Sequence, residues 1–409
     1  MYQGISLTQA PPLAVVFGFF FNAQVYLGLA GILGLAEVWQ GGFSLQGIYF
    51  IHCFSIGFLL LTMFGAISQM LPVLAGVRLQ SPKMTAFFTL LCLNFGLVAF
   101  IAAFRWNLSL FGVALVFLVL GILIFVGSVA LKLRNIEHFT PTIVYICAAL
   151  ASLLLTAGFG VALLGGYAQW WDMPSWLTRF HFSLGGLGWI GLLIIGVSLQ
   201  VLPMFYVAPA FPKAFFVALV PLLLLAFVLS LGFGLEKLAL VFGGGFIACF
   251  GALGLFILGR RKRKIKEASI TFWRVGLSAF MIAGALMWGA IGLELLNVSI
   301  SIFVGGVMAI VYAMMYKIVP FLTWFHLSYA GVLELPNMRE IVPQRIIKVH
   351  LILFIVGFGC ALLWQVSVFA SLFCIICVLL SLIAGFALCK AYRIYTYTLN
   401  NAPRMVWQT

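Results

Sequence analysis

Long apolar runs separated by short polar segments fill the whole chain. Twelve of these runs are long enough to cross a bilayer, which takes about 20 mostly apolar residues per helix. Almost no chain is left between them for a water-soluble domain. The pattern predicts a single polytopic membrane domain over 1–409, with helices at 13–35, 46–73, 84–104, 109–131, 142–166, 179–206, 213–235, 237–259, 271–295, 300–325, 346–366 and 368–392.

The composition agrees with this pattern and excludes several classes of protein. Hydrophobic residues make up 65% of the chain, charged residues only 7%, and the mean hydropathy is +1.23. A soluble domain carries about 25% charged residues, so this chain cannot cover a surface that faces water. A soluble enzyme, a disordered protein and a nucleic-acid-binding protein are therefore excluded.

The positive charges divide unevenly between the two sides of the predicted membrane. Seventeen of the 22 Lys and Arg residues fall on one side, among them the run 260–266, whereas only Arg105, Arg179 and Lys237 fall on the other. Because Lys and Arg concentrate in cytoplasmic loops, we expect both termini to be cytoplasmic. The net charge of +14 is then a topology signal rather than evidence of an anionic partner.

Two similar runs indicate an internal repeat. The second run has His52 near its start and Gln69-Met70-Leu71-Pro72 near its end. The sixth has His181 near its start and Gln200-Val201-Leu202-Pro203 near its end. Both have glycine-rich middles. The tenth run ends in Tyr316-Lys317-Ile318-Val319-Pro320 but has no His at the matching depth. These motifs predict an all-α protein whose twelve helices form three pseudo-symmetric four-helix arcs, over 13–131, 142–259 and 271–392.

His52 and His181 are the main candidates for a cofactor or metal site. Ionisable residues within a membrane are rare and often functional, and neutral imidazole is the commonest metal ligand. Two His at matching depth could ligate one haem iron or contribute to a copper site. The alternative is that each ring only hydrogen-bonds a neighbouring helix. His326 is a weaker metal candidate, and we expect His138 and His350 to be loop or interfacial residues.

Three further polar residues are candidate functional residues. Gln69 and Gln200 could line a polar path, although the favoured interpretation is that they cap carbonyls freed by the prolines that follow. We expect Lys317 to extend its ammonium to the boundary or to pair with another group. Among the eight acidic residues only Glu294 is expected to be embedded. The spans show no buried chain of Asp and Glu, which argues against a proton pump or a proton-coupled transporter.

These features resemble subunit I of the haem-copper oxidases and nitric-oxide reductases, most closely the short relatives of that superfamily, and the plan is similar to that of the NnrS proteins linked to nitric-oxide stress. The resemblance implies the three-arc fold and a bacterial-type inner (cytoplasmic) membrane. It implies that His52 corresponds to a low-spin haem ligand and His181 to a copper ligand. The segments that carry it are Ala10-Pro11-Pro12-Leu13, Gln69-Met70-Leu71-Pro72-Val73, Gln200-Val201-Leu202-Pro203-Met204-Phe205, and Tyr316-Lys317-Ile318-Val319-Pro320-Phe321-Leu322 with Trp324 and His326.

The chain also departs from the patterns of these families. Gly185 stands where the sixth helix of an oxidase has a Tyr, the seventh run lacks a His pair, and the tenth lacks a His-x-His motif. The His-Glu pair of the NnrS proteins is absent, since Cys53 follows His52. The resemblance therefore implies no complete binuclear centre. It leaves open a single haem b or a lone copper ion, with His52 and His181 as ligands separately or together.

The leading hypothesis is a haem-b-binding, oxidase-like membrane protein with a redox, electron-transfer or nitric-oxide-related role. Quinol is a candidate electron donor because it dissolves in the bilayer, and a homo-oligomer is left open. A transporter or channel for a small solute, a metal or haem is the first alternative, because glycine-rich and proline-interrupted helices also occur in transport folds. A cofactor-free scaffold is the second, favoured by the missing ligands.

Overall fold

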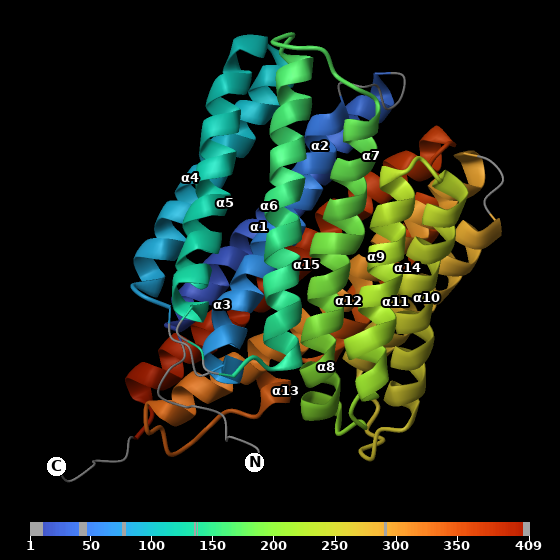
Figure 1. The fold of residues 1–409 in the computed structure, drawn as a ribbon. Coiled ribbons are helices and arrows are strands. Elements are labelled where there is room, and N and C mark those ends of the chain that lie inside the picture. The colour runs from blue at the N-terminus through green and yellow to red at the C-terminus, as the bar shows by residue number, and fades with distance from the viewer. Residues whose placement is uncertain are drawn as a thin grey trace. The chain divides into compact units, whose positions relative to one another are not determined.

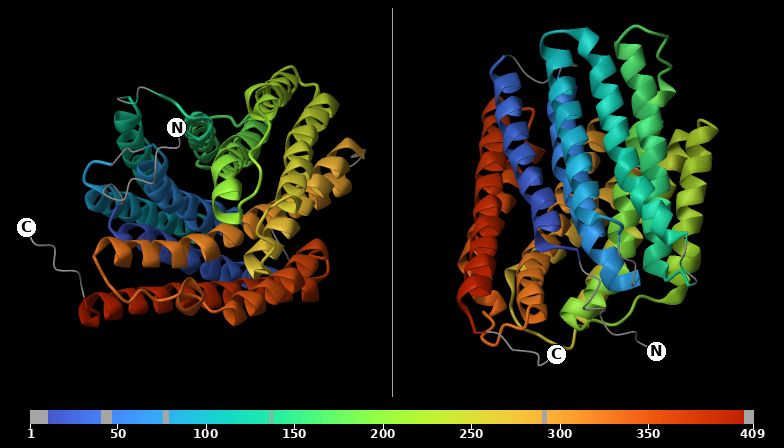
Figure 2. Two further views of the ribbon diagram at one scale, coloured as in Figure 1. Left: turned by 90° about the horizontal axis from the view of Figure 1, so that it is seen from below. Right: turned by 90° about the vertical axis from the view of Figure 1, so that its left-hand side faces the viewer.

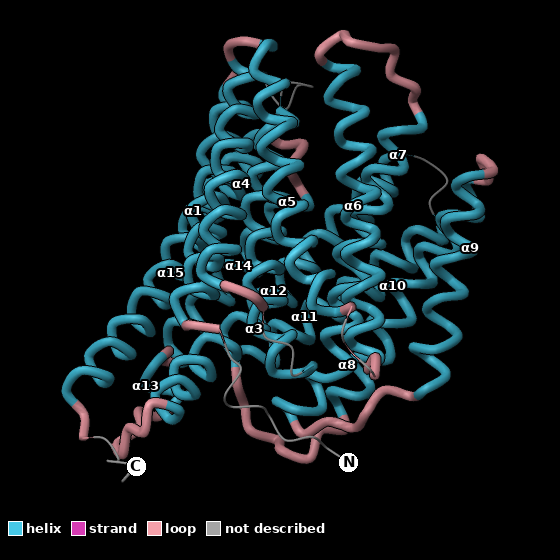
Figure 3. The backbone as a smooth tube through the Cα atoms, turned by 60° about the vertical axis from the view of Figure 1, so that its left-hand side comes forward, coloured by secondary structure: helices cyan, strands magenta, loops and turns pink. Residues whose placement is uncertain are grey.

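The computed structural model describes residues 11–40, 47–75, 79–134, 136, 138–289 and 293–403. Ala10, Arg78, Arg404 and the side chain of Glu294, all used in the sequence-based predictions, lie outside the described residues. Figure 3 shows that the described part of the chain consists of helices and loops.

Twelve helical segments among the described residues are long and apolar enough to cross a membrane, which confirms the predicted number. Each overlaps one predicted run. Two of them extend well beyond a bilayer: α12 has 37 residues and α15 has 35, so each is more than about 50 Å long, against a hydrocarbon core of about 30 Å. The segments are Leu13–Trp39, Ile48–Pro72, Pro82–Arg105, Leu108–Leu133, Pro141–Tyr167, Trp176–Tyr206, Phe215–Gly232, Glu236–Gly259, Ala268–Gly289, Leu295–Tyr329, Gln344–Leu362 and Ser367–Asn401.

The chain divides into two compact units, and the division falls within α12 (Leu293–Tyr329). The first unit comprises Met1–Glu137 and Met315–Thr409, and the second comprises His138–Met314. The helices of the first unit, besides the end of α12, are α1 (Leu13–Trp39), α2 (Ile48–His52), the π-helix η3 (Cys53–Leu60), α3 (Leu61–Ala75), α4 (Pro82–Arg105), the 3₁₀ turn η4 (Leu108–Leu110), α5 (Phe111–Leu133), α13 (Met338–Ile341), α14 (Gln344–Leu362) and α15 (Ser367–Asn401). Those of the second unit are α6 (Pro141–Tyr167), α7 (Trp176–Ser183), the π-helix η5 (Leu184–Gly191), α8 (Leu192–Tyr206), the π-helix η6 (Phe215–Leu219), α9 (Val220–Gly232), α10 (Glu236–Gly259), α11 (Ala268–Gly289) and the start of α12 (Figure 1).

In the first unit α1 packs along α15, and α4 packs along α5. The right-hand view of Figure 2 shows α1, in blue, beside α15, in red. A Cβ atom on Gly31 of α1 would lie only 2.6 Å from the main-chain oxygen of Cys374 in α15. A glycine is therefore required for these two helices to approach this closely, as is common between helices in membranes.

In the second unit the closest helix pair is α10 with α11. A Cβ atom on Gly244 would lie 2.6 Å from the carbonyl oxygen of Gly284, and one on Gly284 would lie 2.3 Å from the carbonyl oxygen of Gly244. The two backbones therefore touch at this pair of glycines, which fixes where the helices cross.

Candidate functional site

His52 is the last residue of α2 and directly precedes the π-helix η3. Its Nδ1 atom lies 2.9 Å from the main-chain oxygen of Ile48, and its ring packs on Phe100 of α4 with 4.8 Å between the centroids. A carbonyl oxygen can only accept a hydrogen bond, so Nδ1 carries the proton and Nε2 carries the lone pair of the neutral ring. That tautomer is the one in which a second-shell carbonyl orients an imidazole ligand.

His181 lies near the end of α7 and has the same tautomer, fixed by a different helix. Its Nδ1 atom lies 2.9 Å from the main-chain oxygen of Thr156 in α6. A Cβ atom on Gly160, one turn further along α6, would lie 3.1 Å from the Cε1 atom of His181. Gly160 therefore leaves the imidazole the room that it occupies, and the half-buried ring is held between α6 and α7.

Each of these two histidines is followed by an eight-residue π-helix. In η3 the N–H of Leu61 bonds to the oxygen of Ile56, and in η5 the N–H of Leu192 bonds to that of Leu187, so both ends have the same i→i−5 bond. The π-helix η3 ends nine residues before Gln69, and η5 ends nine residues before Gln200. His52 and Pro72 are 20 residues apart, and His181 and Pro203 are 22 apart. The two extra residues lie between His181 and the start of η5. Such segments occur frequently at functional sites.

A face of small residues on α6 receives the helix that carries His181. Ser152, Thr156 and Gly160 are spaced four apart, so they lie on one side of α6. The hydroxyl of Ser152 donates to the main-chain oxygen of Leu184, at 3.3 Å, where η5 begins. A Cβ atom on Gly188 would lie 1.9 Å from the Oγ atom of Ser152, so only glycine fits there. The four-residue spacing of these small residues is the sequence signal that could have predicted this contact.

A buried ion pair lies one turn from His52 and was not predicted. Glu37, at the end of α1, is 4% exposed and accepts a hydrogen bond from the hydroxyl of Tyr49, which is 0% exposed. The Nη1 atom of Arg105 lies 3.4 Å from the Glu37 carboxylate and 3.4 Å from the Tyr49 oxygen. The expectation that Glu294 alone among the acidic residues is embedded is therefore wrong. Glu37 and Arg105 lie just after the predicted ends of the first and third runs, on the same side of the predicted membrane. This shared position is the sequence signal from which the pair could have been predicted.

An ion pair also lies beside His181 in the second unit. Arg179 of α7 pairs with Glu236, the first residue of α10, but these side chains are 47% and 65% exposed. Arg105 thus contacts Tyr49 of α2, the helix that ends at His52, and Arg179 lies in α7 together with His181. One pair is mostly buried and the other is open to solvent.

The other polar candidates differ from their expected roles. Gln69 is 4% exposed, and neither atom of its amide makes a hydrogen bond to a described residue. Pro72 has no N–H, so the carbonyl of Ser68, four residues earlier, loses its helical hydrogen bond. The amide of Gln69 was expected to donate to such a carbonyl, and it does not. Gln200 is half-buried. Lys317 is half-buried on α12.

The three remaining histidines lie in different surroundings. His138 is exposed in the segment before α6, as predicted. His350 was expected at the interface, but it is 0% exposed: its Nε2 atom lies 3.2 Å from the main-chain oxygen of Leu380 and its ring meets Tyr316 at a centroid distance of 5.3 Å. His326 is half-buried beside Tyr395, with 6.4 Å between the rings, and its Nε2 atom has no hydrogen bond to a described residue.

The donor set decides which cofactor these residues could hold. No group of three or more His, Cys, Asp and Glu side chains is placed to hold a metal ion in the described part of the chain. His52 and His181 belong to different units, and a main-chain oxygen orients the imidazole of each. A bare copper ion needs several protein ligands, whereas the iron of a haem needs from the protein only an axial one. The residues present therefore fit a haem better than a lone copper ion.

Comparison with known proteins adds no family to this description. No model of a known protein family and no curated protein matches this chain. The resemblance to the oxidases therefore depends on the residues and motifs described above.

Proposed function

We propose that this chain is a haem-binding, oxidase-like integral membrane protein with a redox, electron-transfer or nitric-oxide-related role. One observation carries the proposal: His52 and His181 each lie within three residues of the start of a π-helix, and each π-helix ends nine residues ahead of a Gln-x-Leu-Pro motif.

The proposal assigns the haem-binding role to the Nε2 atoms of His52 and His181. When bound, a haem b supplies one-electron redox chemistry at its iron. The chain's own contribution is orientation, because the main-chain oxygens of Ile48 and Thr156 hold the two rings in the tautomer that a metal ligand requires. Copper at either histidine is the lesser alternative, since three-ligand clusters are absent from the described residues.

The three-arc fold belongs to the same proposal. The matched π-helices support a relation between the second and sixth spans, and hence between the arcs 13–131 and 142–259. The third arc, 271–392, keeps less of the repeated motif. Its helix α12 has no π-helix before Pro320, and Lys317 stands three residues before that proline, where the other two arcs have a glutamine. Loss of ligands from this arc agrees with the absence of a complete binuclear centre.

The membrane location and partners follow from the proposal. The twelve apolar helices suit a lipid bilayer, and the excess of Lys and Arg in one set of loops supports cytoplasmic termini in a bacterial-type inner membrane. Quinol, which reaches such a protein through the bilayer, is the proposed electron donor, and a redox protein partner or assembly into a homo-oligomer is compatible with the same role.

Haem content of purified variants tests the proposal. His52→Ala and His181→Ala should each lower the haem bound per chain, whereas His138→Ala is the matched control because that ring is exposed in a loop. Melting temperatures of the three variants separate ligand loss from misfolding. Unchanged haem content in both His52→Ala and His181→Ala would remove the assignment.

A second candidate, transport of a small solute, a metal or haem, is favoured by Glu37. A mostly buried acid within a membrane protein is by default a functional candidate, although a single acid does not form the chain of carboxylates that a proton relay uses. A colourless protein that supports uptake, with uptake lost in Glu37→Gln, would favour this function. A colourless protein without uptake would favour the cofactor-free scaffold.

A further inference from the structure

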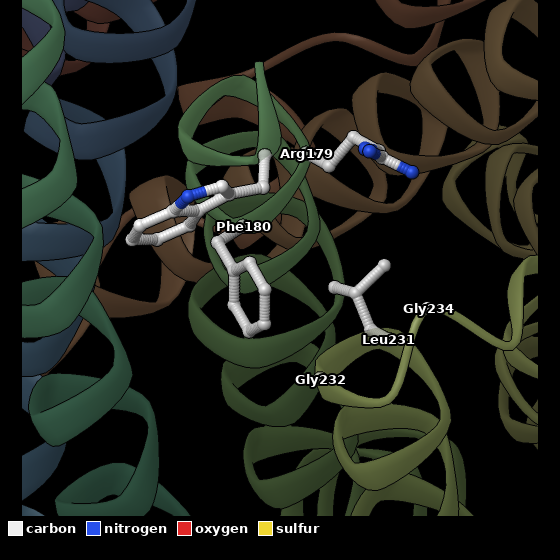
Figure 4. A pocket seen from close by; sticks show the side chains of 6 residues that line it. Arg179, Phe180, Leu231, Gly232 and Gly234 are labelled. Carbon is white, nitrogen blue, oxygen red and sulfur yellow. The ribbon is translucent and has the colours of Figure 1, made fainter. Parts of the chain in front are cut away.

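A cavity opens in the second unit where three membrane-spanning segments end together. Its volume is about 400 Å³, within the range of about 300–1,000 Å³ for small-ligand sites. The side chains of Arg179, Phe180 and Leu231 surround the same space in Figure 4. Its walls are the start of the sixth span, the end of the seventh and the turn before α10, with Trp176, Arg179, Phe180, Leu231, Gly232 and Gly234 as lining residues.

Among the residues that line this cavity only Arg179 is charged, and its ion-pair partner Glu236 lies two residues beyond the lining residue Gly234. Arg179 pairs with Glu236, and each side chain keeps a substantial exposed fraction, 47% and 65%. The pair therefore offers hydrogen-bond donors and acceptors side by side. A ligand with only an anionic group would place like charge beside Glu236, and a purely cationic one would place like charge beside Arg179. The complementary ligand carries both a negative and a positive group.

The remaining walls of the cavity are apolar. Trp176 and Phe180 pack on each other and on Phe159, with ring centroids 5.5 to 6.0 Å apart. Trp at the end of a span is typical of the headgroup level of a bilayer. A Cβ atom on Gly232 would meet no atom within 4 Å, so the turn leaves open space. The site thus joins a charged edge to an apolar wall at the end of the spans.

We propose that this cavity binds the headgroup of a zwitterionic phospholipid. The guanidinium of Arg179 binds the phosphate, the carboxylate of Glu236 accepts hydrogen bonds from a primary ammonium, and the acyl chains leave along Phe180 and Leu231. Phosphatidylethanolamine fits better than phosphatidylcholine, whose quaternary ammonium has no N–H, and better than phosphatidylglycerol, which has no cation for Glu236. The site is independent of the proposed haem ligands, so it stands whether or not the protein binds haem.

Native mass spectrometry of the full-length, delipidated protein tests this site with each of the three lipids. Phosphatidylethanolamine should bind most tightly, and Arg179→Gln and Glu236→Gln should each weaken it by about tenfold or more, the loss expected for a hydrogen bond to a charged group. Gly232→Leu should weaken it by filling the open space. These residues lie at the surface, and melting temperatures check that the variants fold.

The matched control is a second cavity, of about 370 Å³, in the first unit. Its lining includes Arg345, which forms no ion pair with an acidic residue in the described part of the chain, whereas Arg179 pairs with Glu236. Arg345→Gln should therefore leave phosphatidylethanolamine binding unchanged. Phosphatidylglycerol binding as tightly as phosphatidylethanolamine, or equal binding by wild type, Arg179→Gln and Gly232→Leu, would overturn the proposal. Equal binding of phosphatidylcholine would overturn the assigned hydrogen bond to Glu236.

Discussion

The Nδ1 atom of His181 lies 2.9 Å from the main-chain oxygen of Thr156, on the neighbouring helix α6. The equivalent bond of His52 has the same length but is made to Ile48 in its own helix. The position of the His181 ring therefore depends on how α6 and α7 pack, whereas the ring of His52 is oriented locally. Substitutions on α6 are accordingly expected to act on His181.

Gly160→Val should lower the haem content while leaving the fold intact. A Cβ atom at Gly160 would already lie 3.1 Å from the Cε1 atom of His181, so a larger side chain must push the imidazole aside. Gly158→Val on the same helix is the control, because a Cβ atom there meets nothing within 4 Å. The measurement is haem per chain beside the melting temperature. Equal haem content in both variants would show that the ring of His181 does not hold the cofactor.

Glu37→Ala should destabilise the protein, because the buried hydroxyl of Tyr49 and the guanidinium of Arg105 lose their acceptor. An unsatisfied buried group costs about 1–3 kcal/mol. Tyr49→Phe removes the same hydrogen bond, so the double variant should cost less than the sum of the two single losses. Thermal unfolding in detergent measures all three. The exposed Glu236→Ala should cost less than Glu37→Ala, and a strictly additive double variant would contradict the coupling.

Gly188→Ala should be more harmful than Gly127→Ala, although both glycines lie in membrane-spanning helices. The new Cβ atom would lie 1.9 Å from the Ser152 oxygen in the first variant and would meet no atom within 4 Å in the second. Overpacking of this kind costs about 1–3 kcal/mol. Removing the obstructing side chain with Ser152→Gly should restore much of the loss. Failure of that rescue would show that η5 does not pack on α6 through this contact.

The orientation of the chain can be tested by labelling single introduced cysteines with a membrane-impermeant maleimide on whole cells. Asp172→Cys, exposed between α6 and α7, should react from outside, because its loop is on the side poor in Lys and Arg. Arg263→Cys, exposed in the basic loop after α10, should react only after permeabilisation. The parent chain measures the background of the native cysteines. The opposite pattern of labelling would invert the proposed topology.

The sequence predicts the helices well because each span is a long apolar run, and length and polarity alone identify such runs. The π-helices η3 and η5 could not be predicted, since a stretch that is apolar on every side carries no periodic signal to distinguish i→i−4 from i→i−5 bonding. The burial of Glu37 depends on Tyr49 and Arg105, which are 12 and 68 residues away. Burial of this kind depends on tertiary packing that one span alone does not reveal.

The central claim, that this chain binds haem, is tested most directly by the dithionite-reduced and oxidised absorption spectra of the purified protein. The protein should be expressed under haem-replete conditions, and a pyridine haemochromogen assay and iron analysis should be made on the same sample. The account predicts a Soret band with sharp reduced α and β bands of b type. A colourless, iron-free protein would contradict it.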